Sequence, residues 1–204
     1  MKNLVIIRTC LRDDFIAWNC YQSFKNIIPD ADYCFFAEQP RNCERYKWIT
    51  QTGENISFRR WVGNMGGVDY ALPYIEDLKE FNKTTDCFGL HTRWYENIII
   101  SDADIVLYKN PLEHEFDFGG IQDDTNKRHF SGQLQIYDGC LLEKVLNYPE
   151  YPKIVELLLS KNISIADDTL MSWVATMYTD KVFNFFGLGY WLHEKLYHLE
   201  KEAV

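Results

Sequence analysis

The chain has 204 residues, of which 47% are hydrophobic and 25% are charged, and its formal net charge is −9. This length suits one globular domain with a sizeable core and is short for two. The negative charge argues against sequence-independent binding to DNA or RNA, whose phosphates attract clustered lysine and arginine. The composition therefore indicates an acidic globular protein for which bulk nucleic acid is not the main partner.

No targeting or membrane-spanning segment is predicted at the amino terminus. Only four apolar residues follow Met1, Lys2 and Asn3 before Arg8, far fewer than a signal sequence or a membrane span needs. The six cysteines form no CxxC pair, so they are expected to be reduced and mostly buried thiols. We therefore expect a cytoplasmic protein without a transmembrane segment.

Strand-like and helix-like segments alternate along the chain, as in a layered α/β domain with a largely parallel sheet. The pattern predicts strands at 3–9 and 32–38, separated by a helix from Asp13 or Asp14 to Pro29. A third short strand is expected at 47–50 or 56–61, followed by helices at about 68–81 and 88–96. After a central acidic strand, two further strands and two helices are predicted at 116–122, 132–138, 154–160 and 169–178.

The segment 97–111 is the most informative part of the chain, because an apolar run in it contains Asp102 and Asp104. Strand side chains alternate between faces, so two carboxylates at this spacing on one strand point to the same side, about 6 to 7 Å apart. Like charges at that separation repel each other unless a hard cation lies between them. The segment therefore predicts a metal and phosphate site at the middle of the molecule.

Four features, in this order along the chain, resemble the nucleotide-sugar glycosyltransferases of the GT-A fold. They are a first strand ending near Thr9 and Arg12, a second strand ending in Glu38, the DxD motif of Asp102 and Asp104, and the acidic pair Asp167 and Asp168 opening a helix. The resemblance runs from Leu4 to about His193 and implies a single Rossmann-like domain with a mostly parallel central sheet and flanking helices. It divides residues 1–204 into a nucleotide-sugar-binding half, about 1–110, and an acceptor-binding half, about 111–204.

The resemblance also implies how the donor is held. Asp104 is expected to hold Mn²⁺ or Mg²⁺, with Asp102 assisting or contacting the ribose, and the ion stabilises the departing diphosphate. His193, or else His198, is matched to a third ligand, and an imidazole favours manganese. Uracil and ribose contacts are expected from Thr9, Arg12 and Glu38, and diphosphate contacts from Arg60 or Arg59 and from Arg93.

On the acceptor side, the resemblance implies a general base that takes the proton of the attacking hydroxyl in an inverting reaction. Asp168 is the candidate base, and a retaining reaction would not need it. Gly119 and Gly120 are small enough to let a sugar ring approach the backbone. We expect a UDP-sugar as donor and a hydroxyl group as acceptor, while the acceptor molecule stays open.

Two other classes of function stay open at this point. The segment at Asp102 also fits the acidic motif of haloacid-dehalogenase-type phosphatases, with Asp102 as the nucleophile, although that motif normally follows the first strand. A non-catalytic domain that binds a nucleotide or a carbohydrate is the other alternative. Asp167 also suits a purely structural helix cap, because aspartate is favoured at that position.

Overall fold

The computed structural model describes residues 2–9, 14–37, 56–60, 75–76, 78–79, 95–122, 130–163, 167–185 and 191–193. Within these ranges, only the backbone is described at 14–15, 36–37, 56–60, 132, 167 and 191–193.

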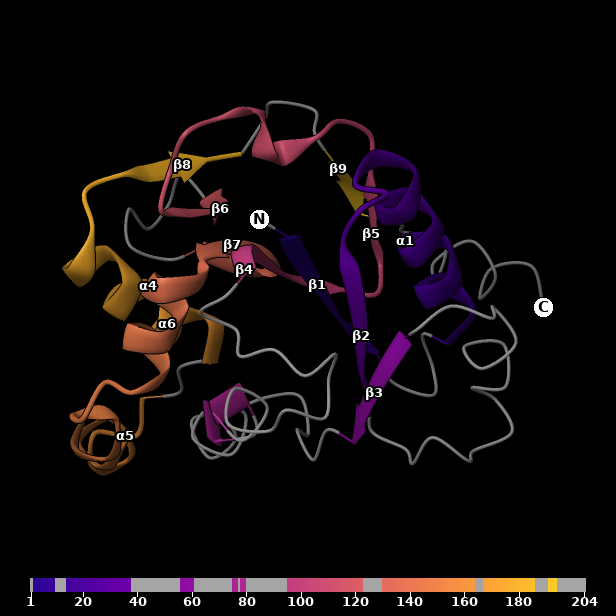
Figure 1. Ribbon diagram of the computed structural model, residues 1–204. Helices are drawn as coiled ribbons and strands as arrows, with labels where there is room; N and C mark the ends of the chain where they lie inside the picture. The colour runs from indigo at the N-terminus through magenta and orange to yellow at the C-terminus, as the bar shows by residue number, and fades with distance from the viewer. Residues whose placement is uncertain are drawn as a thin grey trace.

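A seven-stranded sheet forms the centre of the protein, with strand order β3-β2-β1-β4-β7-β6-β8 (Figure 1). Among these strands, β7 alone runs antiparallel to its neighbours. A second sheet pairs β5 with β9 in antiparallel fashion. The strands are β1 (Lys2–Thr9), β2 (Asp32–Ala37), β3 (Ile56–Arg60), β4 (Tyr95–Asp102), β5 (Ile105–Leu107), β6 (Phe118–Gln122), β7 (Phe130–Asp138), β8 (Val182–Asn184) and β9 (Trp191–His193).

The helices cover both faces of the central sheet (Figure 1). The helices whose bounds the structure describes are α1 (Asp14–Ile27), α4 (Gly139–Leu146), α5 (Tyr151–Ser160) and α6 (Asp167–Tyr178), with a short 3₁₀ helix at Pro111–Glu113. Because strand side chains alternate, Val5 and Ile7 of β1 pack with α1, whereas Leu4 and Ile6 pack with α4 and α6 on the opposite face. Two apolar cores therefore hold the sheet from either side.

The observed architecture confirms the predicted fold class, a mostly parallel central sheet flanked by helices. Three local predictions are wrong or incomplete. The expected helix at 88–96 does not include Tyr95 and Glu96, which begin β4, and α4 was not predicted at all. The acidic segment is also not one continuous strand, because β4 ends at Asp102 and a turn at Ala103 and Asp104 leads into β5.

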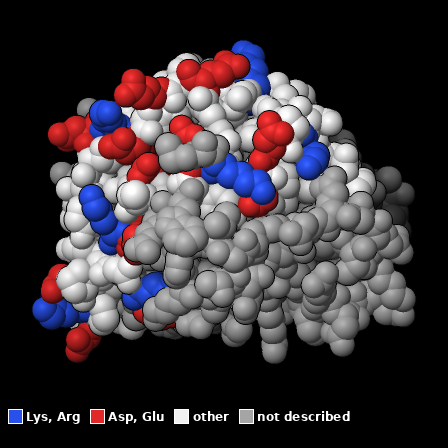
Figure 2. Space-filling view, viewed as in Figure 1, with Lys and Arg blue, Asp and Glu red and all other residues white. Residues whose placement is uncertain are grey.

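The described surface carries charges of both signs. On the face shown in Figure 2, acidic and basic side chains lie among one another over the described residues and do not gather into a single patch of one sign. No helix among the described residues combines the length and the apolar character that crossing a lipid bilayer requires.

Candidate active site

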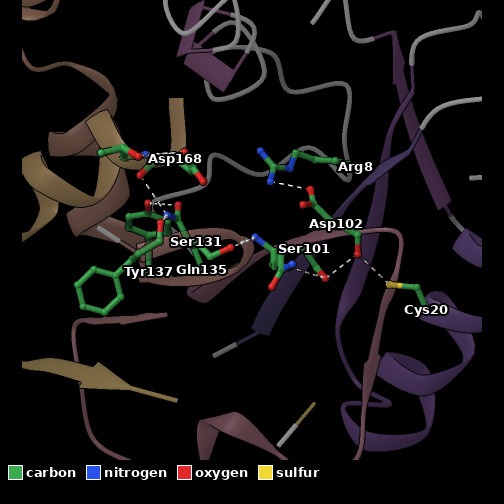
Figure 3. Close-up of polar contacts among 11 residues, drawn as sticks. Arg8, Cys20, Ser101, Asp102, Ser131, Gln135, Tyr137 and Asp168 are labelled. Carbon is green, nitrogen blue, oxygen red and sulfur yellow. Dashed lines mark hydrogen bonds and ion pairs between the residues drawn. The ribbon is translucent and has the colours of Figure 1, made fainter. Parts of the chain in front are cut away.

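The carboxyl ends of β1 and β4 meet at one edge of the sheet and place Arg8 beside Asp102. The two residues are register partners on parallel strands, and Arg8 Nη2 lies 2.6 Å from Asp102 Oδ1 (Figure 3). The Arg8 side chain is 9% exposed and that of Asp102 is 38% exposed. A guanidinium group that donates to a carboxylate at this distance forms a strong, charge-assisted interaction. Asp102 is therefore held at the edge of the sheet, with part of its carboxylate open to solvent.

The backbone at Asp102 is also fixed from the opposite face of the sheet. Ser101 Oγ donates to the Asp102 carbonyl oxygen at 3.0 Å, and the Cys20 thiol of α1 donates to the same oxygen at 3.6 Å (Figure 3). Burial raises the pKa of the Cys20 thiol, and the nearby carboxylates of Asp104 and Asp102 raise it further. Cys20 therefore stays protonated at neutral pH and acts as a donor that anchors the end of β4.

The turn after β4 carries Asp104, and β5 continues from it. Leu107 N donates to Ser23 Oγ of α1 at 3.0 Å, so β5 is attached to the helix that covers this face. In the small sheet, Ile105 is the register partner of His193 on β9. The topology therefore brings the backbone of His193 next to the residue that follows Asp104.

This arrangement fits the ligand set expected for a divalent cation. Asp102 ends β4, Asp104 lies in the next turn, and the backbone of His193 is on the strand paired at that turn; carboxylate oxygens and imidazole nitrogens are donor types that Mn²⁺ accepts. Among the side chains that the structure describes, no three of His, Cys, Asp and Glu form a metal-ligating group. The His193 side chain lies outside that set, so its role as a ligand stays a prediction.

Asp168 lies at the start of α6 and is tied to β7 through Gln135. Gln135 Nε2 donates to the Asp168 carbonyl oxygen at 3.1 Å and to the Phe130 carbonyl oxygen at 3.0 Å (Figure 3). Gln135 Oε1 accepts from the Tyr137 hydroxyl at 2.6 Å. Asp168 Oδ1 in turn accepts from Thr169 N at 2.7 Å. This partly buried network fixes the amino terminus of α6 on the sheet.

The Asp102 and Asp168 side chains lie on the same face of the central sheet. Arg8 and Asp102 continue the strand positions whose apolar residues pack against α6, and Gln135 occupies the equivalent position on β7. In Figure 3, Asp168 and the Arg8 and Asp102 pair lie on one side of the strands, whereas Cys20 lies on the other. The fold therefore orients the candidate base and the first aspartate of the DxD motif toward the same region.

The structure describes only some of the other residues that were predicted to contact the nucleotide-sugar donor. The backbones of Thr9, Ala37 and Arg60 align in register across β1, β2 and β3, so Thr9 and Arg60 lie at the same sheet edge as Asp102. Thr9 is buried, and the Arg60 side chain is outside the described set. The remaining predicted contacts, Arg12, Glu38, Arg93 and the alternative ligand His198, lie outside the described residues.

Packing explains why residues 119 and 120 are glycines, whereas the sequence suggested that they leave room for a sugar ring. A Cβ atom on Gly119 would lie 2.6 Å from Phe185 Cε2, and one on Gly120 would lie 2.9 Å from Phe130 Cδ1. Both glycines thus make room for buried aromatic rings, and this packing accounts for their small size without a sugar ligand.

Arg8 and Gln135 are site residues that the sequence analysis did not identify. Each is a buried polar side chain that directly follows a buried apolar residue of its strand, Ile7 or Leu134. That pattern is a usable signal, because buried polar groups require partners and therefore mark places where specific interactions form.

Comparisons with known proteins bear on the fold. No protein-family model matches the sequence, and no curated protein matches it significantly. The crystal structure of the galactosyltransferase LgtC, in complex with donor and acceptor sugar analogs, matches 89% of this chain and 72% of its own, with a TM-score of 0.57 and 12% identity. The chain has a glycosyltransferase fold.

A second structure with this glycosyltransferase fold is GlyE from Streptococcus pneumoniae TIGR4. It matches 91% of this chain with a TM-score of 0.55 and 9% identity. The chain spans 45% of the GlyE chain, less than half of that protein's length. Identities this low establish the common architecture alone.

Proposed function

We propose that the protein transfers a sugar from a nucleotide-sugar donor, a UDP-sugar, to a hydroxyl acceptor. The observation that carries this proposal is the position of Asp102. It ends β4 at the carboxyl edge of the parallel strands, the edge at which open α/β sheets bind their ligands. Asp104 follows in the adjoining turn, within a fold that LgtC and GlyE share.

On the donor side, we assign Asp102, Asp104 and His193 as the residues that would hold Mn²⁺ or Mg²⁺. When bound, the ion supplies positive charge to the departing diphosphate. Thr9, with the predicted contacts Arg12 and Glu38, would bind the nucleoside at the ends of β1 and β2, and Arg60 and Arg93 would neutralise phosphate oxygens. The alignment of Thr9 and Arg60 at one sheet edge supports this arrangement.

On the acceptor side, we assign Asp168 as the general base that takes the hydroxyl proton while the oxygen attacks the anomeric carbon. Its carboxylate lies on the same face of the sheet as Asp102, and the Gln135 network fixes its backbone. A base held by a rigid network keeps its geometry through the reaction, and this lowers the cost of proton transfer. This assignment makes the reaction an inverting transfer.

A panel of nucleotide sugars incubated with the protein and Mn²⁺ tests the proposal, with nucleotide release as the readout. We expect turnover of a UDP-sugar that a chelator abolishes and that Asp104→Ala lowers by about a hundredfold or more. Asp30→Ala is the matched control, because Asp30 is exposed in the turn after α1, and it should retain full activity.

Three results would contradict the proposal. The first is that no donor is turned over, and the second is that Asp104→Ala behaves like the wild type. The third is cleavage of a generic phosphomonoester, which would indicate the phosphatase alternative with Asp102 as nucleophile. Within the first result, saturable binding of a sugar nucleotide would indicate a non-catalytic binding domain.

A further inference from the structure

Arg8 is an unusual residue for its place in the chain. It follows four fully buried apolar residues of β1, Leu4 to Ile7, and its side chain is only 9% exposed. A buried guanidinium group costs desolvation free energy unless a negative partner compensates its charge. The 2.6 Å contact with Asp102 supplies that partner. The charge of Arg8 is therefore directed at the candidate metal site and not at solvent.

Arg8 places a positive charge directly beside the first aspartate assigned to the ion. Its guanidinium group lies 2.6 Å from the Asp102 carboxylate, and Asp104 follows in the next turn. Arg8 thus offsets the charge of the Asp102 carboxylate before any ligand binds. Its position in register with Asp102 makes this compensation part of the fold, since neighbouring parallel strands fix it.

We propose that Arg8 is a built-in counter-cation that weakens binding of a divalent metal ion alone and strengthens binding of the metal together with a diphosphate. This inference rests on the proposed function for the identity of the second ligand. Its effect is to make the metal and the nucleotide bind as a pair.

The reason is the sign of the Arg8 charge. The guanidinium group lies against Asp102, so it repels a divalent ion held by that carboxylate and attracts a diphosphate on the ion. Without Arg8, the ion alone would meet less repulsion, and the diphosphate would lose one source of attraction. Removing Arg8 should therefore change the two affinities in opposite directions.

The test is a pair of calorimetric titrations, first with MnCl₂ alone and then with UDP in the presence of MnCl₂. Arg8→Met removes the charge, and Arg8→Gln removes it while keeping a hydrogen-bond donor for Asp102. For both variants we expect Mn²⁺ alone to bind at least about tenfold more tightly, and UDP with Mn²⁺ at least about tenfold more weakly. If Arg8→Met does not fold, as judged by circular dichroism, Arg8→Gln decides the test.

Lys2→Met is the matched control. Lys2 lies on the same strand and forms an ion pair with Asp32, but it does so at the opposite edge of the sheet. The change in net charge is the same as in Arg8→Met. We expect both affinities to stay within about threefold of the wild type, because screening in salt suppresses the effect of a distant surface charge.

The outcomes separate Arg8 from the proposed function. Weaker binding of the Arg8 variants in both titrations would show that Arg8 is only structural and would overturn the inference. Unchanged affinities would also overturn it. So would the absence of Mn²⁺ binding in every protein. If Mn²⁺ binds the Arg8 variants more tightly but UDP binds none of the proteins, the repulsion between Arg8 and the metal ion is supported, while the effect on the diphosphate fails together with the nucleotide-sugar proposal.

Discussion

Gln135 gives the sharpest prediction about the connection between the sheet and the candidate base. The side chain is 2% exposed and forms three hydrogen bonds, two from Nε2 to the carbonyl oxygens of Phe130 and Asp168 and one to Oε1 from the Tyr137 hydroxyl. Gln135→Met keeps the length and most of the volume of the side chain but removes the amide. The substitution leaves a buried hydroxyl and two carbonyl oxygens without these partners.

The expected cost follows from these contacts. Leaving a buried polar group without its partner costs about 1–3 kcal/mol. Tyr137 is fully buried, so its hydroxyl should carry most of the penalty. We therefore expect Gln135→Met to lower the free energy of unfolding by about 3 kcal/mol, which corresponds to a melting temperature about 6–12 °C lower in a chain of this size.

Chemical unfolding in urea measures this cost, and the double variant Gln135→Met with Tyr137→Phe is its internal control. Removing both ends of the hydrogen bond leaves no stranded hydroxyl, so the double variant should be more stable than the sum of the single effects predicts, by about 1 kcal/mol or more. Additive effects, or a Gln135→Met variant within about 0.5 kcal/mol of the wild type, would refute the role of this network.

Two further predictions concern packing and pH. Gly119→Ala should lower the free energy of unfolding by about 1–3 kcal/mol, because its Cβ would lie 2.6 Å from the buried Phe185 ring, and a melting temperature equal to that of the wild type would contradict this. Burial raises the pKa of the Cys20 thiol above its ordinary value of 9.0, so the folded protein keeps a proton that the unfolded chain loses at higher pH. Stability should therefore be unaffected by this group below pH 9.0 and fall above it, by up to about 1.4 kcal/mol per pH unit. Urea unfolding of Cys20→Ala across that range should show a shallower decline, and identical slopes would count against the assignment.

The strands of the sheet were largely predictable from the sequence, because their apolar runs are short and bounded by polar residues. The end of β4 at Asp102 was predictable for the same reason, since Asp102 interrupts an apolar run. The helix α4 was missed, although Asp138 caps it by accepting from Cys140 N and Leu141 N, and an aspartate before an apolar segment is a standard start signal.

The remaining features depend on contacts between distant parts of the chain. The apolar pattern of β5 is as strand-like as that of β4, so the turn between them could not be predicted without knowing that β5 pairs with β9. Arg8 acquires its role only because β4 lies beside β1 in a fixed register. Gln135 likewise depends on the packing of α6 over β7. Local sequence patterns do not encode such pairings.

A crystal of the protein soaked with UDP and Mn²⁺ tests the central claim most directly, because anomalous scattering locates the metal without assumptions about activity. We predict one Mn²⁺ ion bound by the carboxylates of Asp102 and Asp104, with the diphosphate on the ion and the uridine at the carboxyl ends of β1 and β2. Metal and nucleotide bound elsewhere on the chain, with both aspartates uncoordinated, would contradict the account.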